Sequence, residues 1–243
     1  MLIGVIVMVA AVVAAQSDIC PIRATSRSRD ANDWDFYLFV NQWPATNCLG
    51  SHHTQCAAAE FPIFTIHGLW PQRCDGTWPQ FCNNRRFDPS AVTDLLPDLQ
   101  QHWPDLYGKG VSFWDHEYRK HGTCTDGDEH DYFAAALQLA RTYNITTMLA
   151  QREIVPNSEG VGYMVEEWED AIENGTGHKP IVWCKKVDGE PIIDQILLCI
   201  NPSSMNATQC PPAERNKNCP LDSPIGYPLY ANRRFTPISV AQL

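Results

Sequence analysis

The order of apolar and polar residues predicts strands in the first third of the chain. Residues 34–43 are dense in aromatic and aliphatic side chains, which is typical of a central strand buried on both faces of a sheet. Residues 61–70 predict a second strand, in which His67 is expected to point to the opposite face from Ile66. Gly68 follows at once and permits a turn or a close approach of the backbone.

Helical spacing dominates the middle of the chain. Residues 88–102 keep apolar positions at helical intervals, with Pro97 as an expected irregularity. Acidic residues precede one apolar stripe over residues 126–140, as expected for a helix with acid at its positive end. Residues 161–173 predict a further helix.

Strands return in the last third of the chain. Residues 180–186 and 191–200 are joined through Asp188-Gly189, a dipeptide that signals a hairpin. The chain has 243 residues, 44% of them hydrophobic, which is enough for the core of one domain. We therefore predict a single α+β domain with a central antiparallel sheet, flanked by helices and stapled by disulfides.

The charge balance argues against a general surface for polyanions. The formal net charge is −10 at pH 7, and the sequence pI is near 5.2. Proteins that bind nucleic acid through long-range attraction usually carry a basic surface. Any polyanionic substrate must therefore be held locally, by a few cations.

The first residues of the chain predict a cleaved secretory signal peptide. Residues 1–15 carry no charged side chain and end in the small residues that a signal peptidase prefers. Their apolar run is shorter than the roughly 20 residues of a membrane span, although an uncleaved anchor is the alternative. The mature chain, 16–243, would open with a polar arm at 16–33 that Cys20 ties down, and it would not attach to a membrane.

Cysteines and glycosylation sequons agree with this secretory route. Ten cysteines, an even number, predict disulfides formed in an oxidising compartment. Asn144, Asn174 and Asn206 each begin a sequon for N-glycosylation. We expect the protein outside the cell or in a lysosomal or vacuolar lumen.

The segment from Ser112 to Cys124 concentrates the chemically active side chains. In a helix with about 3.6 residues per turn, Glu117, Lys120 and His121 share one face. His116 stands one turn before Lys120, but about 140° around the helix from His121. Two histidines in that arrangement cannot grip one ion from one face, so we predict no metal site and no other cofactor.

These residue types are the ones that phosphodiester transfer without a metal ion requires. Imidazoles move protons near neutral or mildly acid pH, and candidates lie at His67 and in the pair His116 and His121. Glu117 could orient His121 and support its charged form, and Lys120 could neutralise charge on a phosphorane. The alternative to catalysis is that the histidine in the strand has a structural role and that the polar helix face is simply exposed to solvent. A cysteine nucleophile is a poor fit, because an even set in a secreted chain is most simply all disulfide.

Two segments of the chain carry a family resemblance. Residues 64–71, Phe-Thr-Ile-His-Gly-Leu-Trp-Pro, and residues 113–124, Phe-Trp-Asp-His-Glu-Tyr-Arg-Lys-His-Gly-Thr-Cys, closely resemble the active-site segments of the ribonuclease T-two family. This family of secreted acid ribonucleases includes the plant S-ribonucleases. The resemblance is strongest from Trp34 to Cys124 and continues in the length and in the cysteine placement.

The resemblance implies cleavage of single-stranded RNA with little base preference. The ribose 2′-OH would attack its own phosphate, giving a 2′,3′-cyclic phosphate and then a 3′-phosphate, and DNA would be rejected because it lacks that hydroxyl. On the motif positions, His121 matches the general base and His67 the general acid. The remaining matches are Glu117 and Lys120 for the transition state, His116 for the phosphate, Trp70 for the base upstream of the cut, and Gln42 and Phe113 for a base site.

The resemblance also implies a disulfide pattern. It pairs Cys48 with Cys56, Cys82 with Cys124, Cys184 with Cys219 and Cys199 with Cys210, which leaves Cys20 and Cys74 by elimination. We expect a monomer that is most active at acid pH, where its histidines become cationic. Two rival functions remain, a secreted glycoprotein of the same fold that acts by binding alone, and a phosphodiesterase for another substrate.

Overall fold

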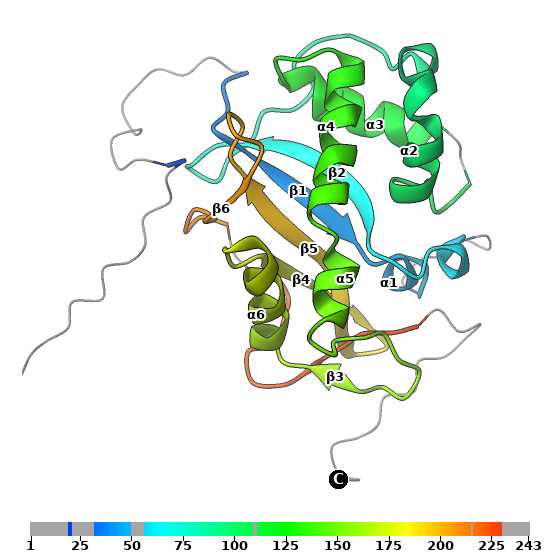
Figure 1. The fold of residues 1–243 in the computed structure, drawn as a ribbon, viewed down its shortest axis with the longest axis vertical. Helices are drawn as coiled ribbons and strands as arrows, with labels where there is room; N and C mark the ends of the chain where they lie inside the picture. The colour runs from blue at the N-terminus through cyan, green and yellow to red at the C-terminus, as the bar shows by residue number, and fades with distance from the viewer. Residues whose placement is uncertain (1–18, 21–31, 50–55, 109–110, 215, 230–243) are drawn as a thin grey trace, which may run out of the picture.

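The computed structural model describes residues 19–20, 32–49, 56–108, 111–214 and 216–229. The expected leader at 1–15 and most of the arm at 16–33 lie outside the described residues. The predicted α+β class is confirmed, because one sheet is combined with helices in a single body (Figure 1). No helix among the described residues is long and apolar enough to cross a membrane.

Three antiparallel strands form the centre of the sheet. Strand β1 (Phe36–Gln42) lies between β2 (Thr65–Gln72) and β5 (Glu190–Ile200), and β4 (Ile181–Val187) pairs with the other edge of β5. Three two-residue strands complete the sheet: β3 (Gly162–Tyr163), β6 (Ala207–Thr208) and β7 (Ile225–Gly226). Strand β7 pairs with β5 in the parallel direction, an exception to the predicted antiparallel sheet.

Each face of the sheet packs against a different kind of cover. On one face, Phe39 and Ile66 join the main core with helix α4 (Glu129–Thr142), which crosses in front of the sheet in Figure 1. On the other face, Leu38 and Val40 belong to a second cluster that includes disulfide cysteines. Strand β1 is thus buried on both faces, as predicted, and loops held by disulfides take the place of a second helical layer.

A β-bulge interrupts β2 at His67. Val40 pairs with Gly68 and Asn41 pairs with Ile66, which leaves His67 as the extra residue without a partner on β1. A bulge of this kind bends the strand and re-aims its side chain. After the bulge, Leu69 rather than Gly68 shares the core face of Ile66.

The helices agree in part with the sequence pattern. The predicted helix with acidic residues at its start is present as α4, which begins at Glu129. Asp128 is its N-cap, and Asp131 completes a capping box. The single helix predicted over 88–102 is wrong. The chain instead forms a 3-10 segment η3 (Pro89–Leu95), and α2 (Leu96–His102) follows it with Pro97 in its first turn, where proline is tolerated.

Other boundaries also differ from the prediction. Helix α6 (Val165–Thr176) begins four residues later than position 161, because residues 162 and 163 are used in β3. Strand β2 begins at Thr65 rather than at residue 61. The pattern did not predict the short strands β3, β6 and β7. It also did not predict three short helical elements, which are α1 (Pro44–Leu49), the 3-10 turn η2 (Ala58–Glu60) and α5 (Ile145–Ala150).

The predicted hairpin is confirmed. Val187 and Glu190 pair across a two-residue turn in which both Asp188 and Gly189 have positive φ, at 52° and 90°. That conformation matches the twist of the strands and is the reason for an Asp-Gly signal. The five disulfides join the expected pairs, Cys20–Cys74, Cys48–Cys56, Cys82–Cys124, Cys184–Cys219 and Cys199–Cys210.

Candidate active site

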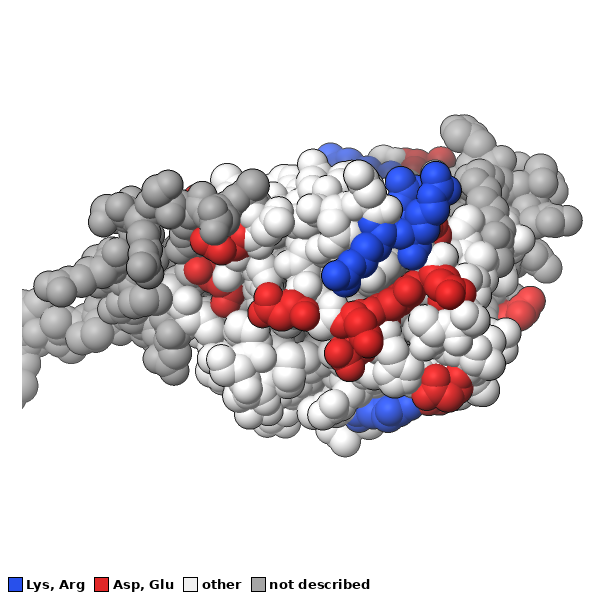
Figure 2. Space-filling view, turned by 90° about the horizontal axis from the view of Figure 1, so that it is seen from above, with Lys and Arg blue, Asp and Glu red and all other residues white. Residues whose placement is uncertain are grey.

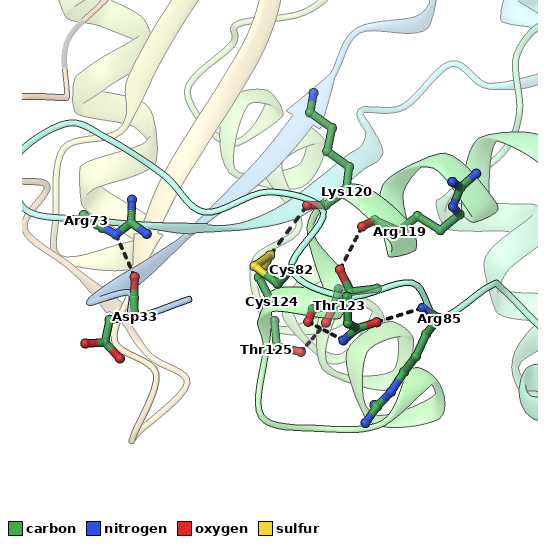
Figure 3. The surroundings of a disulfide bond; sticks show 11 residues. Asp33, Arg73, Cys82, Arg85, Arg119, Lys120, Thr123, Cys124 and Thr125 are labelled. Carbon is green, nitrogen blue, oxygen red and sulfur yellow. Dashed lines mark hydrogen bonds between the residues drawn. A yellow bond between two sulfur atoms is a disulfide. The ribbon is translucent and has the colours of Figure 1, made fainter. Parts of the chain in front are cut away.

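The site is formed where helix α3 (Ser112–Lys120) meets strand β2. His121 is the C-cap of this helix, and its N–H donates to Glu117 O at 2.9 Å. A 3-10 turn, η4 (Gly122–Cys124), follows, and Cys124 is bonded to Cys82. In Figure 3, the Lys120 side chain points away from this disulfide. The sequence placed His121 on a helical face with Glu117 and Lys120. In the structure, His121 is the residue at which that helix ends.

Glu117 lies between two histidines. Its side chain is 2% exposed, with Oε1 at 3.8 Å from His67 Nε2 and Oε2 at 4.0 Å from His121 Nε2. Trp70 donates its indole N–H to Glu117 Oε2 at 2.9 Å. One carboxylate thus faces both candidate proton-transfer groups and is oriented by the indole.

Gly68 is the residue that permits this approach. A Cβ at position 68 would overlap the Trp70 indole and Glu117 Oε2. The hydrogen bond from Trp70 to Glu117 therefore requires a residue without a side chain at position 68. The close approach predicted from the sequence is confirmed.

His67 is held at three points. Its carbonyl accepts from Trp103 Nε1 at 2.9 Å, and its Nδ1 lies 2.9 Å from Gln195 Nε2. Its ring contacts the edge of Trp70, with 5.0 Å between ring centroids. The side chain is 27% exposed, so the ring is fixed but still open to solvent on one side.

His121 is more enclosed. The residue is 3% exposed, and its ring stacks on Trp70 with centroids 5.1 Å apart and an interplanar angle of 20°. Neither ring nitrogen has a hydrogen-bond partner among the described residues. Both nitrogens are also buried, so a substrate group reaches this unpartnered imidazole only if neighbouring side chains move.

Burial sets the ionisation of these three groups. It raises the pKa of Glu117 to about 7, although the Trp70 hydrogen bond acts in the opposite direction. Burial and the positive charge of Lys120 lower the pKa of His67 to about 4 and that of His121 to about 2. In the free protein, His121 therefore stays neutral at an acidity that begins to protonate His67.

Lys120 and His116 lie further out. Lys120 lines a cavity of about 320 Å³ with Trp70 and His121, and Trp78 and Lys217 lie on the same wall. His116 is exposed, and its pKa is lowered by partial burial and by Lys120. The charge of His116 also helps to lower the pKa of His67 and of His121, which shows that it stands near both.

The two candidate base-site residues occupy different surroundings. Phe113 is half-buried with its ring 5.8 Å from that of His67, so it borders the site directly. Gln42 is 5% exposed, and its carbonyl oxygen accepts from Asn47 Nδ2 at 3.1 Å. The structure thus places both near β2 but encloses Gln42 in protein contacts.

Two contributors, Gln195 and Trp103, were missed by sequence reasoning. Gln195 is 128 positions from His67, so no local spacing could connect them. Its only signal was a polar residue inside the apolar run 191–200. Trp103 lies just after α2 and is fully buried, like many core tryptophans, and nothing in the pattern revealed its bond to His67 O.

One face of the molecule carries both signs of charge. Figure 2 shows Lys and Arg side chains gathered beside a row of Asp and Glu on one face. Cations therefore occur in local groups in spite of the net charge of −10. The three sequon asparagines, Asn144, Asn174 and Asn206, are all exposed, which leaves them accessible. No three His, Cys, Asp or Glu side chains of the described part are placed to hold a metal ion.

Comparisons with known proteins agree on one family. The family model described as "Ribonuclease T2 family" matches residues 34–210. "Ribonuclease 1" of Arabidopsis thaliana is 36% identical over 195 residues, covering 76% of this chain and 84% of that protein. "Ribonuclease DdI" of Dictyostelium discoideum is 37% identical over 188 residues, covering 76% and 81%.

A solved structure extends the likeness to three dimensions. The crystal structure of RNase NT in complex with 5′-AMP superposes with a TM-score of 0.73 at 36% identity, covering 81% of this chain and 98% of that one. The matched family residues include β1, β2 and α3, which carry the site. By sequence and by fold, the chain belongs to the Ribonuclease T2 family.

Proposed function

We propose that the protein is an endoribonuclease that cleaves single-stranded RNA with little base preference and without a metal ion. The observation that carries this proposal is the buried Glu117 carboxylate facing His67 and His121 at 3.8 and 4.0 Å. Two imidazoles on one carboxylate can serve the two ends of an in-line displacement at phosphorus. The family match and the RNase NT complex with 5′-AMP support a nucleotide ligand for this site.

In the first step the RNA supplies its own nucleophile. The 2′-OH gives its proton to His121 and attacks the adjacent phosphorus, and a 2′,3′-cyclic phosphate forms. The P–O5′ bond breaks, and the 5′-oxygen keeps the electron pair and takes a proton from His67. Water later opens the cyclic phosphate to a 3′-phosphate. DNA has no 2′-OH and is not a substrate.

The ionisation of the site favours these two roles. A base must be neutral and an acid protonated in the same molecule, so the group with the higher pKa suits the acid. His67, with a pKa of about 4, lies above His121, with a pKa of about 2. A bound phosphate raises the pKa of a histidine beside it, because its negative charge favours the imidazolium. The assignment implies an acid optimum, which suits a lysosomal, vacuolar or extracellular setting after removal of the leader.

The surrounding groups have supporting roles. Lys120 neutralises charge on the phosphorane. Burial holds Glu117 protonated at acid pH, and the carboxyl supports the imidazolium on His121 once it ionises. His116 adds charge for the phosphate. Trp70 and Phe113 offer aromatic faces for bases, and such stacking is tolerant of sequence. Gln42 remains the weakest assignment to a base site, because its carbonyl oxygen already accepts from Asn47.

One assay tests the proposal. The protein is incubated at about pH 5 with EDTA, together with single-stranded RNA or DNA of the same sequence. We expect RNA to give 2′,3′-cyclic and then 3′-phosphate ends, and DNA to survive. His121→Ala should lose at least about 100-fold in kcat. His130→Ala is the matched control, because His130 pairs with Asp94 on the surface.

Three outcomes would contradict the proposal. They are intact RNA, a block of cleavage by EDTA, and full activity of the His121 variant. The first outcome would favour a binding protein of the same fold.

A further inference from the structure

Gln195 is a buried polar residue in an apolar strand. It is 7% exposed, and its neighbours across the sheet are Gln42 on β1 and Trp183 on β4. Its Nε2 lies 2.9 Å from His67 Nδ1. Its Oε1 is buried and has no hydrogen-bond partner among the described residues. Buried amide oxygens are normally bonded, so the unpartnered end requires an explanation.

The other contacts of His67 show which ring nitrogen is free to react. The backbone is anchored by Trp103 Nε1, and Nδ1 is occupied by Gln195. Nε2 faces the site, at 3.8 Å from Glu117 Oε1. The bulge at His67 removes this residue from regular pairing with β1, so its ring depends on these side-chain contacts for its orientation.

We propose that Gln195 is the positioning residue of His67, holding Nδ1 so that Nε2 is the nitrogen that protonates the leaving group. This inference rests on the proposed function. A carboxamide can hold both protonation states of an imidazole. Gln195 Nε2 donates to the bare Nδ1 of the neutral ring, and after rotation of the amide Oε1 accepts from the Nδ1–H of the imidazolium.

The proton balance of the reaction requires the second arrangement, in which Gln195 Oε1 accepts from His67 Nδ1–H. When the P–O5′ bond breaks, the 5′-oxygen keeps the electron pair and takes the proton from Nε2 of the His67 imidazolium. The other proton stays on Nδ1, where Gln195 Oε1 accepts it. Nε2 then has a lone pair directed into the site, which is the form that takes a proton from water when the cyclic phosphate is opened.

Paired variants at position 195 test this role. Gln195→Leu removes both hydrogen bonds, whereas Gln195→Glu is close in size and places a negative acceptor on Nδ1. We expect Gln195→Leu to lower kcat about tenfold or more, with KM within about twofold, and to move the loss of activity with rising pH to lower pH. We expect Gln195→Glu to retain activity and to move that loss about one pH unit upward.

A control and a spectroscopic readout separate positioning from folding. Thr65→Val is the matched control, because Thr65 is 1% exposed on β2 and its hydroxyl has no hydrogen-bond partner among the described residues. It should leave the pH profile unchanged. In the free wild-type protein, the ¹⁵N shifts of the neutral His67 ring should show the Nε2–H tautomer, which Gln195 Nε2 holds by donating to Nδ1. Gln195→Leu should show a mixture of tautomers.

The outcomes distinguish this inference from the function on which it rests. The inference is overturned if the pH profiles of both Gln195 variants coincide with the wild type, if Thr65→Val reproduces their shifts, or if the tautomer is unaffected by Gln195→Leu. Failure of the wild type to cleave RNA would instead overturn the proposed function. The ¹⁵N measurement would still decide whether Gln195 fixes the ring.

Discussion

At the scale of the residue, the site depends on how closely a carboxylate, an indole and a glycine backbone pack. Glu117 is almost fully buried, and among the described residues its carboxyl group accepts a hydrogen bond from Trp70 alone. Gly68 lies beneath that bond. A buried carboxyl group with so few hydrogen-bond partners favours its neutral, protonated form, because the ionised form would lose its hydration there.

Gly68→Ala should disturb both groups at once. The new methyl group overlaps the Trp70 indole and the Glu117 carboxylate, so one of them must move. We expect kcat on RNA to fall at least about tenfold, with a loss of about 1–3 kcal/mol in the free energy of unfolding. Gly177→Ala is the control, because its φ of 79° is strained for alanine but the added Cβ meets nothing within 4 Å. An active Gly68→Ala protein would contradict the tight packing.

Glu117→Gln tests the ionisation of the carboxyl through stability. The folded pKa of about 7 lies above the ordinary value of 4.5, so between these values the unfolded chain loses the proton while the folded protein keeps it. The wild type is therefore destabilised as pH rises through this window, by up to about 3 kcal/mol above pH 7.

Glu117→Gln removes this pH-dependent destabilisation, because its amide does not titrate. In urea unfolding, Glu117→Gln should be more stable than the wild type near pH 8 and equal to it near pH 4. Activity should fall in the same variant, because an amide cannot ionise to support the His121 imidazolium as that imidazolium forms. A variant that is destabilised equally at both pH values would show that Glu117 ionises normally.

At the scale of the element, two interruptions of regular structure create the site. The bulge in β2 leaves His67 without a partner on β1, and helix α3 ends at His121. A disulfide anchors the end of α3, because Cys124 follows in η4 and is bonded to Cys82. Phe81 N–H also donates to Lys120 O at 3.0 Å, so the loop before Cys82 is paired with the end of the helix.

Removal of the disulfide Cys82–Cys124 should affect stability and activity together. A sequence separation of 42 residues corresponds to about 4 kcal/mol in the chain-entropy model, and the end of α3 loses its anchor. The Cys82→Ser, Cys124→Ser double variant should therefore unfold at lower denaturant and lose kcat. The control is removal of Cys48–Cys56, which is 8 residues apart and corresponds to about 2.5 kcal/mol. Equal kcat in both double variants would contradict the anchoring role.

At the scale of the whole molecule, a net acidic protein is proposed to act on a polyanion. The net charge of −10 at pH 7 opposes RNA, whereas the pI near 5.2 means that this opposition disappears at acid pH. Local attraction then depends on Lys120 and Lys217 at the cavity, because His121 in its lining stays neutral. The pH of the compartment thus acts on both binding and proton transfer.

The response to salt should therefore change sign with pH. Raising ionic strength from about 0.01 to 0.2 M shortens the screening length from about 30 Å to below 10 Å. At pH 7 this screens repulsion, so KM for RNA should stay constant or fall. At pH 4.5 it screens attraction, so KM should rise. Steady-state kinetics at both pH values would test this, and a KM that rises equally with salt at pH 7 and 4.5 would contradict it.

The sequence by itself determined the features that depend on local pattern. The strand at β1, the capped start of α4 and the Asp-Gly hairpin follow from periodicity and turn chemistry over a few residues. The candidate residues His67, Glu117 and His121 follow from chemistry and from a family resemblance. The disulfide pairs came from that resemblance, because cysteine spacing alone does not define a pairing.

Only the tertiary structure decided how these residues work together. The kink at the buried Val92 within η3 and the late start of α6 reflect packing and strand pairing that override helical spacing. A one-residue bulge at His67 is invisible in a linear pattern, and Gln195 reaches His67 from another strand. The pKa values of Glu117, His67 and His121 depend on burial, which exists only once distant segments exclude water from the site.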